Sequence, residues 1–347
     1  FFGWLVLGIT VGRVSGTPVR TLSLNYALMS YAILLGIELA LFSTPGRLRR
    51  VAVGFLAGAT VAALLGTSQV LFGGFPGDFL LEDGRAFRGQ LYIPGSRRLA
   101  ATGTLHHRLK MSEMWLVAIA ILVAGLLGQK RRWLVVLGLA VTGVFLGLTF
   151  TKAALGAAVI AVTAGLVAVR WPRLGGWILG ALVAGLLLIW PVAVSVGLNT
   201  TPTLPVPRGS LEVRPWLWSF AADLFLTRPI FGGGIGTYFF ASQAVVISGN
   251  ESHMFGAHQQ LFTIAVEAGV VGVFLFSGSL FASGIGIARG LVRNHAGRTL
   301  AVFAFTLLVA IGVTAVMHDV IFHPGTALVF WLAVGVGLGL APRGTES

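Results

Sequence analysis

Ten continuous apolar runs constrain the fold of this chain more than any other feature of its sequence. Most of them reach the roughly 20 residues that a helix needs to cross a bilayer, and they hold few or no charges. Because the runs do not alternate, and because backbone groups in lipid must be hydrogen-bonded within each segment, we expect helices. The first run begins at Phe1, so an upstream part with further helices is also expected. The expected spans are 1–12, 26–43, 51–72, 112–128, 133–150, 153–169, 174–197, 258–286, 299–317 and 324–341.

The sequence therefore predicts an all-α polytopic membrane protein in which residues 1–347 form a single transmembrane domain. Positive charges in the short connections predict its orientation. Twelve of the 24 Lys and Arg residues fall on one side of the expected spans, and the connections there hold no acid except Glu346. By the positive-inside rule this side is the cytoplasm. The twelve residues are Arg47, Arg49, Arg50, Lys130, Arg131, Arg132, Arg170, Arg173, Arg289, Arg293, Arg298 and Arg343.

The opposite side carries the other twelve cations, mainly in two long connections at about 73–111 and 198–257. A chain with only 10% charged residues does not need a dozen external cations for solubility. We interpret them as a basic cavity that receives an anion at the outer leaflet, in preference to solvated loops that touch lipid phosphates. They are Arg13, Arg20, Arg85, Arg88, Arg97, Arg98, Arg108, Lys110, Lys152, Arg208, Arg214 and Arg228.

Composition excludes several classes of site. The absence of Cys removes disulfides, thiolate metal sites and Cys nucleophiles. The basic residues are divided among membrane loops without interleaved aromatic residues, which argues against nucleic acid. External acids are scattered, so neither a metal nor another cofactor is expected. Glycine pairs such as Gly54 with Gly58, and Gly138 with Gly143, indicate close helix packing.

The later long connection holds most of the chemistry. A short surface helix is expected over 214–223, since Pro215 suits a first turn and its Trp residues suit a membrane interface. Four glycines follow within 232–236, and they either bring backbone N–H groups close to an anion or form a turn. His258 then stands at the outer end of a span. Glu267 lies inside that span, where a structural role with a cation or a hydrogen-bond donor is expected.

Together these segments resemble the C-terminal signature of the O-antigen ligase and polymerase superfamily. The matching elements are Arg214 followed by Trp, the stretch Arg228 to Gly236, His258-Gln259, and the E-x-G-x-x-G stretch from Glu267. The chain departs from the family pattern at two positions. Gln259 stands where the family usually has Asn, and Lys152 stands where it usually has Arg, which keeps the charge but loses the bidentate fork. A second stretch, with Gly103, His107 and Glu113, is similar to a feature of ligase members and favours ligase over polymerase.

The resemblance implies a lipopolysaccharide-biosynthetic glycosyltransferase in the bacterial inner membrane with its active site facing the periplasm. Its donor would be a glycan on undecaprenyl diphosphate, its acceptor a sugar hydroxyl of lipid A-core, and membrane lipids would surround it. Cations would stabilise the charge that develops on the diphosphate, and Arg214 and Lys152 are the first candidates, with Arg88 and Arg108 behind them.

His258 is the candidate base for the acceptor hydroxyl, although it could instead hydrogen-bond the diphosphate. His107, His253 and Gln259 are candidates for supporting roles. Direct displacement by the activated hydroxyl implies inversion at the anomeric carbon, without metal or nucleotide.

Two other functions remain open at this stage. A polysaccharide polymerase of the same superfamily would use the same donor, and a second lipid-linked glycan as its acceptor. A transporter of an anionic lipid or solute should have ionisable residues near the middle of the membrane and paired broken helices. Glu38 and Glu267 are the clear midspan cases, and no inverted repeat is evident, so interfacial transfer is favoured over transport.

Overall fold

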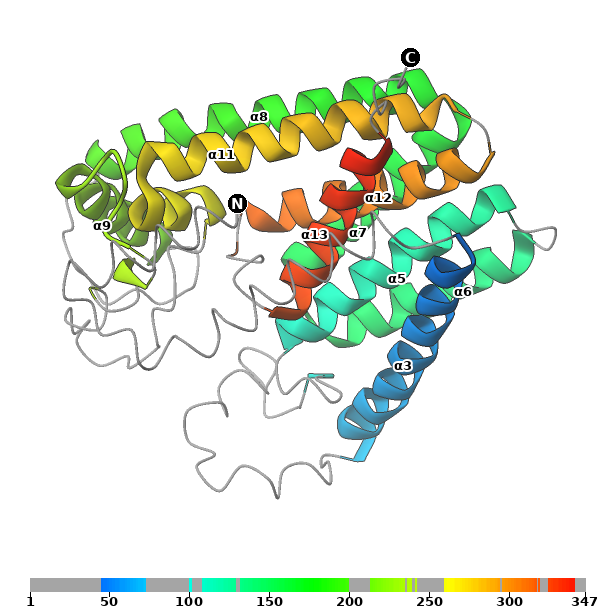
Figure 1. Ribbon diagram of the computed structural model, residues 1–347. Coiled ribbons are helices and arrows are strands. Elements are labelled where there is room, and N and C mark those ends of the chain that lie inside the picture. The colour runs from blue at the N-terminus through cyan, green and yellow to red at the C-terminus, as the bar shows by residue number, and fades with distance from the viewer. Residues whose placement is uncertain are drawn as a thin grey trace, which may run out of the picture. The chain divides into compact units, whose positions relative to one another are not determined.

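The computed structural model describes residues 45–72, 100–101, 108–128, 132–199, 213–234, 236–238, 241, 259–293, 295–316, 318 and 324–340. These residues form nine helices and the turns beside them, with no strand among them. Figure 1 shows the helices, which are α3 (Pro45–Phe72), α5 (Arg108–Gly128), α6 (Arg132–Leu148), α7 (Lys152–Arg170), α8 (Pro172–Asn199), α9 (Val213–Thr227), α11 (Gln260–Leu291), α12 (His295–Ala315) and α13 (Pro324–Leu340).

The expected spans agree with these helices wherever the structure describes them. Each of the eight spans from residue 51 onward coincides with a helix, and α9 contains the short helix expected over 214–223. The spans at 1–12 and 26–43 lie outside the described residues, as does most of the two long connections. Within the part of the chain that the structure describes, five helical segments are long and apolar enough to cross a membrane, which is consistent with a polytopic membrane protein: Leu48–Leu71, Arg108–Gly128, Lys152–Arg170, Gln260–Leu291 and Gly297–Ala315.

Proline fixes where three of the helices begin. Pro45, Pro172 and Pro324 are the first residues of α3, α8 and α13. Proline suits this position because its missing N–H would have no partner in the first turn and its φ is already helical. The short connection between α7 and α8 follows from the same chemistry, since Trp171 alone separates Arg170 from Pro172.

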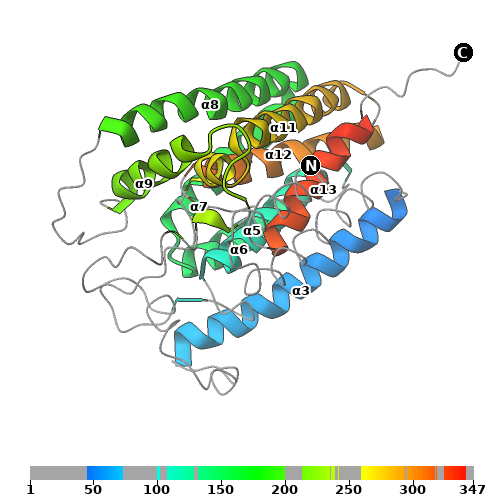
Figure 2. The ribbon, with the colours of Figure 1, turned by 60° about the vertical axis from the view of Figure 1, so that its left-hand side comes forward.

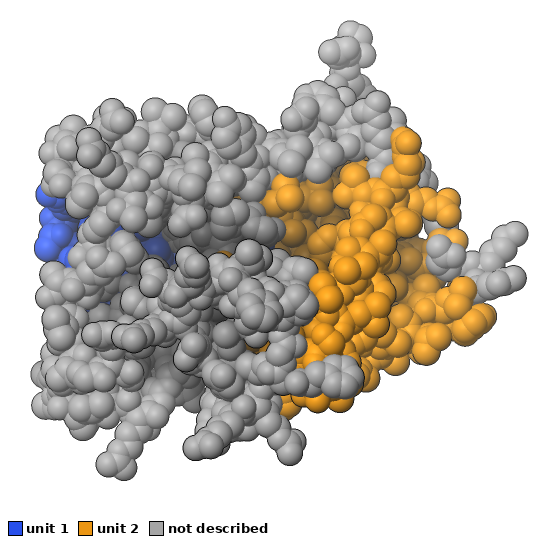
Figure 3. Space-filling model, turned by 90° about the horizontal axis from the view of Figure 1, so that it is seen from below, with its two compact units in different colours: residues 1–34, 180–282, 312–327 blue, residues 35–179, 283–311, 328–347 orange. Residues whose placement is uncertain are grey.

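The chain divides into two compact units, which Figure 3 colours separately. Unit 1 comprises residues 1–34, 180–282 and 312–327, and unit 2 comprises residues 35–179, 283–311 and 328–347. Four helices, α8, α11, α12 and α13, contribute residues to both units. Within unit 2, α5 packs against α6 and α7, and α3 packs against α5 and α6 (Figures 1 and 2).

Small residues bring the helices of unit 2 close together. The buried face of α7 consists of Ala and Gly, and a Cβ at Gly165 would lie only 2.6 Å from Thr306 Oγ1 of α12 and 2.7 Å from Val123 Cγ1 of α5. Of the four glycines in the expected pairs, only one packs closely against another helix. Gly138 packs against Leu122, whereas Gly54, Gly58 and Gly143 face open space. Close packing therefore occurs where a glycine faces another helix, which the sequence spacing alone did not identify.

Two of the basic connections meet at one end of unit 2. Arg298, near the start of α12, donates a hydrogen bond from Nη2 to the carbonyl of Val169, next to Arg170 at the end of α7. This contact places the α7–α8 and α11–α12 connections at the same end, as the charge pattern predicts. Which membrane face this end occupies stays a prediction.

Candidate functional site

A break in α11 is the central feature of the candidate site in unit 1. Gly269 has φ +64° and ψ −165°, which no helix accommodates, so α11 changes direction there. A break of this kind leaves carbonyls before it and N–H groups after it without partners in the helix. A Cβ at Gly269 would overlap the carbonyl of Ile230, so the residue must be glycine both for its φ and for the close approach.

The glycine-rich segment 229–236 supplies the missing partners. Gly233 and Gly234 donate their N–H groups to the carbonyls of Val266 and Glu267, at 2.9 and 3.0 Å. In the other direction, Val270 and Val271 donate to the carbonyls of Pro229 and Ile230, at 2.8 and 3.2 Å. Gly232 is pressed so closely on Glu267 and Ala268 that a Cβ would overlap their backbone. The two motifs of the sequence are thus one interlocked structure.

The Glu267 side chain completes this interlock. It is only 2% exposed, and its Oε1 accepts a hydrogen bond from the Gly236 N–H at 2.9 Å. The N–H groups of all four glycines are therefore used within the protein, because Gly232 also donates to the carbonyl of Arg228. The glycine run forms a structural turn rather than an N–H cradle for an anion, and Glu267 has the structural role expected of it.

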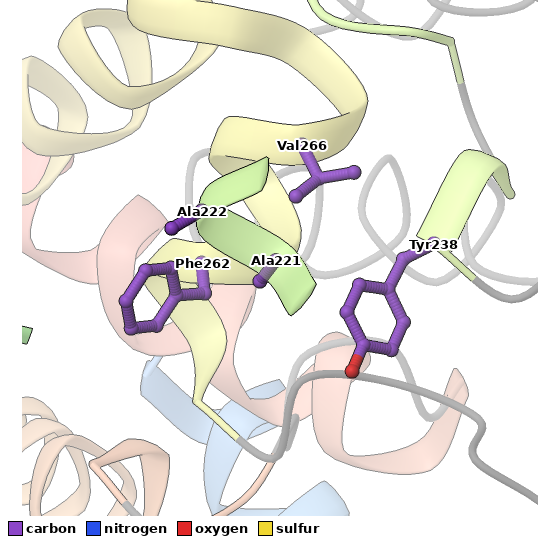
Figure 4. Close-up of a cluster of buried hydrophobic side chains, with 5 residues drawn as sticks. All are labelled: Ala221, Ala222, Tyr238, Phe262 and Val266. Carbon is purple, nitrogen blue, oxygen red and sulfur yellow. The ribbon is translucent and has the colours of Figure 1, made fainter. Parts of the chain in front are cut away.

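Hydrophobic packing then fixes α9 against the first part of α11. Figure 4 shows buried side chains from α9, from α11 and from the segment after the glycine run, and they are Ala221, Ala222, Phe262, Val266 and Tyr238. Trp218 of α9 stacks on Phe262 with 6.1 Å between the ring centroids. Tyr238 meets Phe220 edge to face at 5.6 Å, and its hydroxyl donates to the carbonyl of Leu217 at 3.4 Å.

These contacts place the backbone that carries two candidate residues. Arg214 is the second residue of α9, about one turn before Trp218. Gln259 directly precedes α11, is 1% exposed, and accepts a hydrogen bond from the Phe262 N–H through Oε1 at 2.8 Å. It therefore acts as the N-cap of α11, a role that Asn also performs, and this explains why the departure from the family pattern is tolerated.

Lys152 and Arg108 lie in unit 2, at the start of α7 and of α5. Lys152 is exposed and follows a tight turn in which Phe150 has φ +51°, an uncommon value for a residue other than glycine. Thr151 is extended at the N-cap position and donates its hydroxyl to the Thr149 carbonyl. This turn directs the chain from α6 into α7, so that a cation begins α7.

Arg108 begins α5 and is only partly exposed. Its Nη1 atom is buried and has no hydrogen-bond partner among the described residues. A buried guanidinium N–H without an acceptor is costly, so this atom is suited to an anionic ligand. Trp115, two turns along α5, stacks on Phe145 of α6 and anchors this end of the helix.

The remaining candidates, Arg88, His107, His253 and His258, lie outside the described residues. His258 directly precedes the capping residue Gln259 in the chain. Within the part of the chain that the structure describes, no three His, Asp or Glu side chains gather as a metal site.

The part of the chain that resembles a known protein family contains both the glycine-rich segment and the break in α11. Residues 137–277 match the O-antigen ligase family model. Over this part of the chain, which is less than half of its length, the protein is similar to the O-antigen ligase family. The matched range includes Lys152, Arg214, His258 and the E-x-G stretch, whereas Arg88 and Arg108 precede it. No curated protein matches the chain significantly.

The hydrogen bonds also show what sequence reasoning missed. The sequence identified both motifs but not their pairing, which joins residues more than 30 positions apart. A glycine inside an otherwise uniform apolar run was the available signal for the break at Gly269. The strained turn at Phe150 had no signal in the sequence, because nothing in Thr149-Phe150-Thr151 favours a positive φ.

Proposed function

We propose that this protein is an O-antigen ligase. It would transfer a polysaccharide from undecaprenyl diphosphate to a sugar hydroxyl of lipid A-core at the periplasmic face of the inner membrane. The observation that carries the proposal is the family match over 137–277, within which the glycine-rich segment and the broken helix α11 interlock and fix α9. That scaffold supports Arg214 at the start of α9 and the cap of α11 directly after His258.

In the proposed reaction the acceptor hydroxyl oxygen attacks the anomeric carbon of the donor glycan. The bond between that carbon and the diphosphate oxygen breaks, and undecaprenyl diphosphate leaves with the bonding electron pair. His258 takes the proton of the hydroxyl, which fits a side chain that titrates near neutral pH. One direct displacement inverts the anomeric configuration.

Cations would stabilise the negative charge that grows on the leaving diphosphate. Arg214 and Lys152 are the first candidates, and Arg108 and Arg88 are the next. Arg108 is supported by its buried Nη1 atom, which has no acceptor among the described residues. Because protein cations can neutralise the diphosphate, we propose that transfer needs neither a metal nor a nucleotide.

Reconstitution tests this proposal. The purified protein is placed in liposomes with an undecaprenyl-diphosphate-linked glycan and lipid A-core, in EDTA and without nucleotide. We expect glycan on lipid A-core with the wild type and with His295→Ala, and a loss of about 10²–10⁴-fold with His258→Ala. His295 is a suitable control because it begins α12, far along the chain from the family motifs.

Other products would identify the alternatives. A lengthened lipid-linked glycan without modified lipid A-core would establish the polymerase. A reaction that requires Mg²⁺ would contradict metal independence, and a trapped glycosyl-enzyme would contradict direct displacement. Movement of the donor lipid without any transfer would favour the transporter.

A further inference from the structure

We propose that the Glu267 carboxylate is a positioning residue that sets the place of α9, and with it Arg214, for the transfer reaction. The role of Arg214 rests on the function proposed above, whereas the link between Glu267 and α9 rests on contacts within unit 1. Glu267 therefore acts through another residue and does not itself touch the substrate.

The burial of Glu267 first calls for an explanation. An acid that is 2% exposed within a long apolar helix is costly to keep in a membrane protein. A buried carboxylate at this position therefore indicates a specific task. Its Oε1 accepts a hydrogen bond from the Gly236 N–H at 2.9 Å, 31 residues away in the chain.

Gly236 connects Glu267 to α9 by a short route. Tyr238 follows two residues later and is fully buried. Its ring packs edge to face on Phe220, and its hydroxyl donates to the Leu217 carbonyl, so it contacts α9 at two points. Leu217 lies within one turn of Arg214. A displacement of the Gly236 turn must therefore be accommodated by the first turns of α9.

The direct packing of α9 on α11 predicts that this displacement is small. Trp218 stacks on Phe262, and Ala221 and Ala222 share the buried cluster with Val266. These contacts do not involve the Glu267 side chain, so α9 should remain folded without it. We therefore expect a shifted or broadened position of α9 rather than its release.

Kinetics provide the first arm of the test. Glu267→Ala should lower kcat by about 10- to 100-fold, because a displacement near 1 Å at a reacting group has effects of this size. The KM for the donor should change little, since Arg214 is proposed to act on charge that develops in the transition state. Glu267→Gln retains an oxygen that can accept from Gly236, and it should restore most of the activity.

A double-mutant cycle separates positioning from general damage. In an Arg214→Ala background, Glu267→Ala should cause little further loss, because the residue through which it acts is already absent. Leu261→Ala is the matched control. It truncates a side chain of α11 that is 4% exposed and takes no part in the Gly236 contact, so it should lower the unfolding temperature but keep kcat per folded protein. Fully additive losses would overturn the inference.

A distance measurement makes the test independent of enzyme activity. The chain has no Cys, so spin labels on Asp223→Cys of α9 and Phe274→Cys of α11, both exposed, report one distance by electron paramagnetic resonance. We expect the same narrow distribution with Glu267 and Glu267→Gln, and a shifted or broader one with Glu267→Ala. An unchanged distribution would overturn the inference whether or not the protein transfers glycan. A changed distribution in a protein without ligase activity would instead contradict the proposed function alone.

Discussion

Gly269 is the position in the candidate site where only glycine fits the backbone. Its φ of +64° is unfavourable for any L side chain, and a Cβ there would overlap the Ile230 carbonyl. We expect Gly269→Ala to destabilise the protein by roughly 2–4 kcal/mol, since it adds backbone strain to a clash between two fixed backbones. Thermal unfolding followed by Trp fluorescence in detergent measures the loss.

Gly278→Ala is the matched control in the same helix. Nothing lies within 4 Å of a Cβ at this position, and its φ is ordinary. Alanine is a better helix former by about 1 kcal/mol, so the unfolding temperature should stay level or rise. Equal unfolding temperatures for the two variants would mean that the interlock of α11 with the glycine-rich segment does not support stability.

Single residues also show how far the sequence predicts the site. Glu267 and Gln259 could be identified from their motifs, and the structural role expected of Glu267 is confirmed. The partner of Glu267 could not be identified, because a backbone N–H at Gly236 has no signature in the sequence. The functions of Arg214 and His258 stay predictions, since they depend on substrates and not on the fold alone.

At the scale of the helix, α7 begins and ends with a cation. Lys152 lies at the positive end of the helix dipole, where it is unfavourable, and Arg170 lies at the negative end, where it is favourable. We expect Arg170→Gln to lower the free energy of unfolding by about 0.3–1 kcal/mol. Lys152→Gln should leave the free energy of unfolding unchanged or raise it by up to about 1 kcal/mol. If Lys152 contacts the diphosphate, transfer should fall only with Lys152→Gln.

Both variants are compared by thermal unfolding and by the reconstituted transfer assay at low ionic strength. A loss of stability without a loss of transfer in Lys152→Gln would contradict its proposed role. The reasoning is that a cation kept at an unfavourable position, after a turn strained at Phe150, is retained for binding rather than for folding.

The helices themselves were largely predictable from the sequence. Uninterrupted apolar length defines a span, and Pro172 and Pro324 mark helix starts, so the expected spans at 174–197 and 324–341 lie close to α8 and α13. The break in α11 was not predictable in this way. Its cause is a set of hydrogen bonds to a distant segment, and the apolar pattern continues through Gly269 without change.

At the scale of the whole molecule, the charge pattern and the contacts of unit 2 both group basic connections at one end of its helices. The hydrogen bond from Arg298 to Val169 places two basic connections at one end of unit 2, and the positive-inside rule assigns such an end to the cytoplasm. The candidate residues Lys152 and Arg108 begin helices whose other ends adjoin basic connections. Both are therefore predicted to lie at the periplasmic end of their helices, where a lipid-linked donor would be used.

Cysteine labelling tests this orientation directly, because residues 1–347 contain no Cys. Single Cys residues are placed at Asp223 of α9 and at Ile230, and, on the predicted cytoplasmic side, at Trp171 and Val292; all four positions are exposed. We expect a membrane-impermeant maleimide to label the first two in intact spheroplasts, and the last two only after lysis. Labelling of Trp171→Cys or Val292→Cys in intact spheroplasts would reverse the topology. It would also move the candidate site to the cytoplasmic face, where transfer to an outer-leaflet acceptor is excluded.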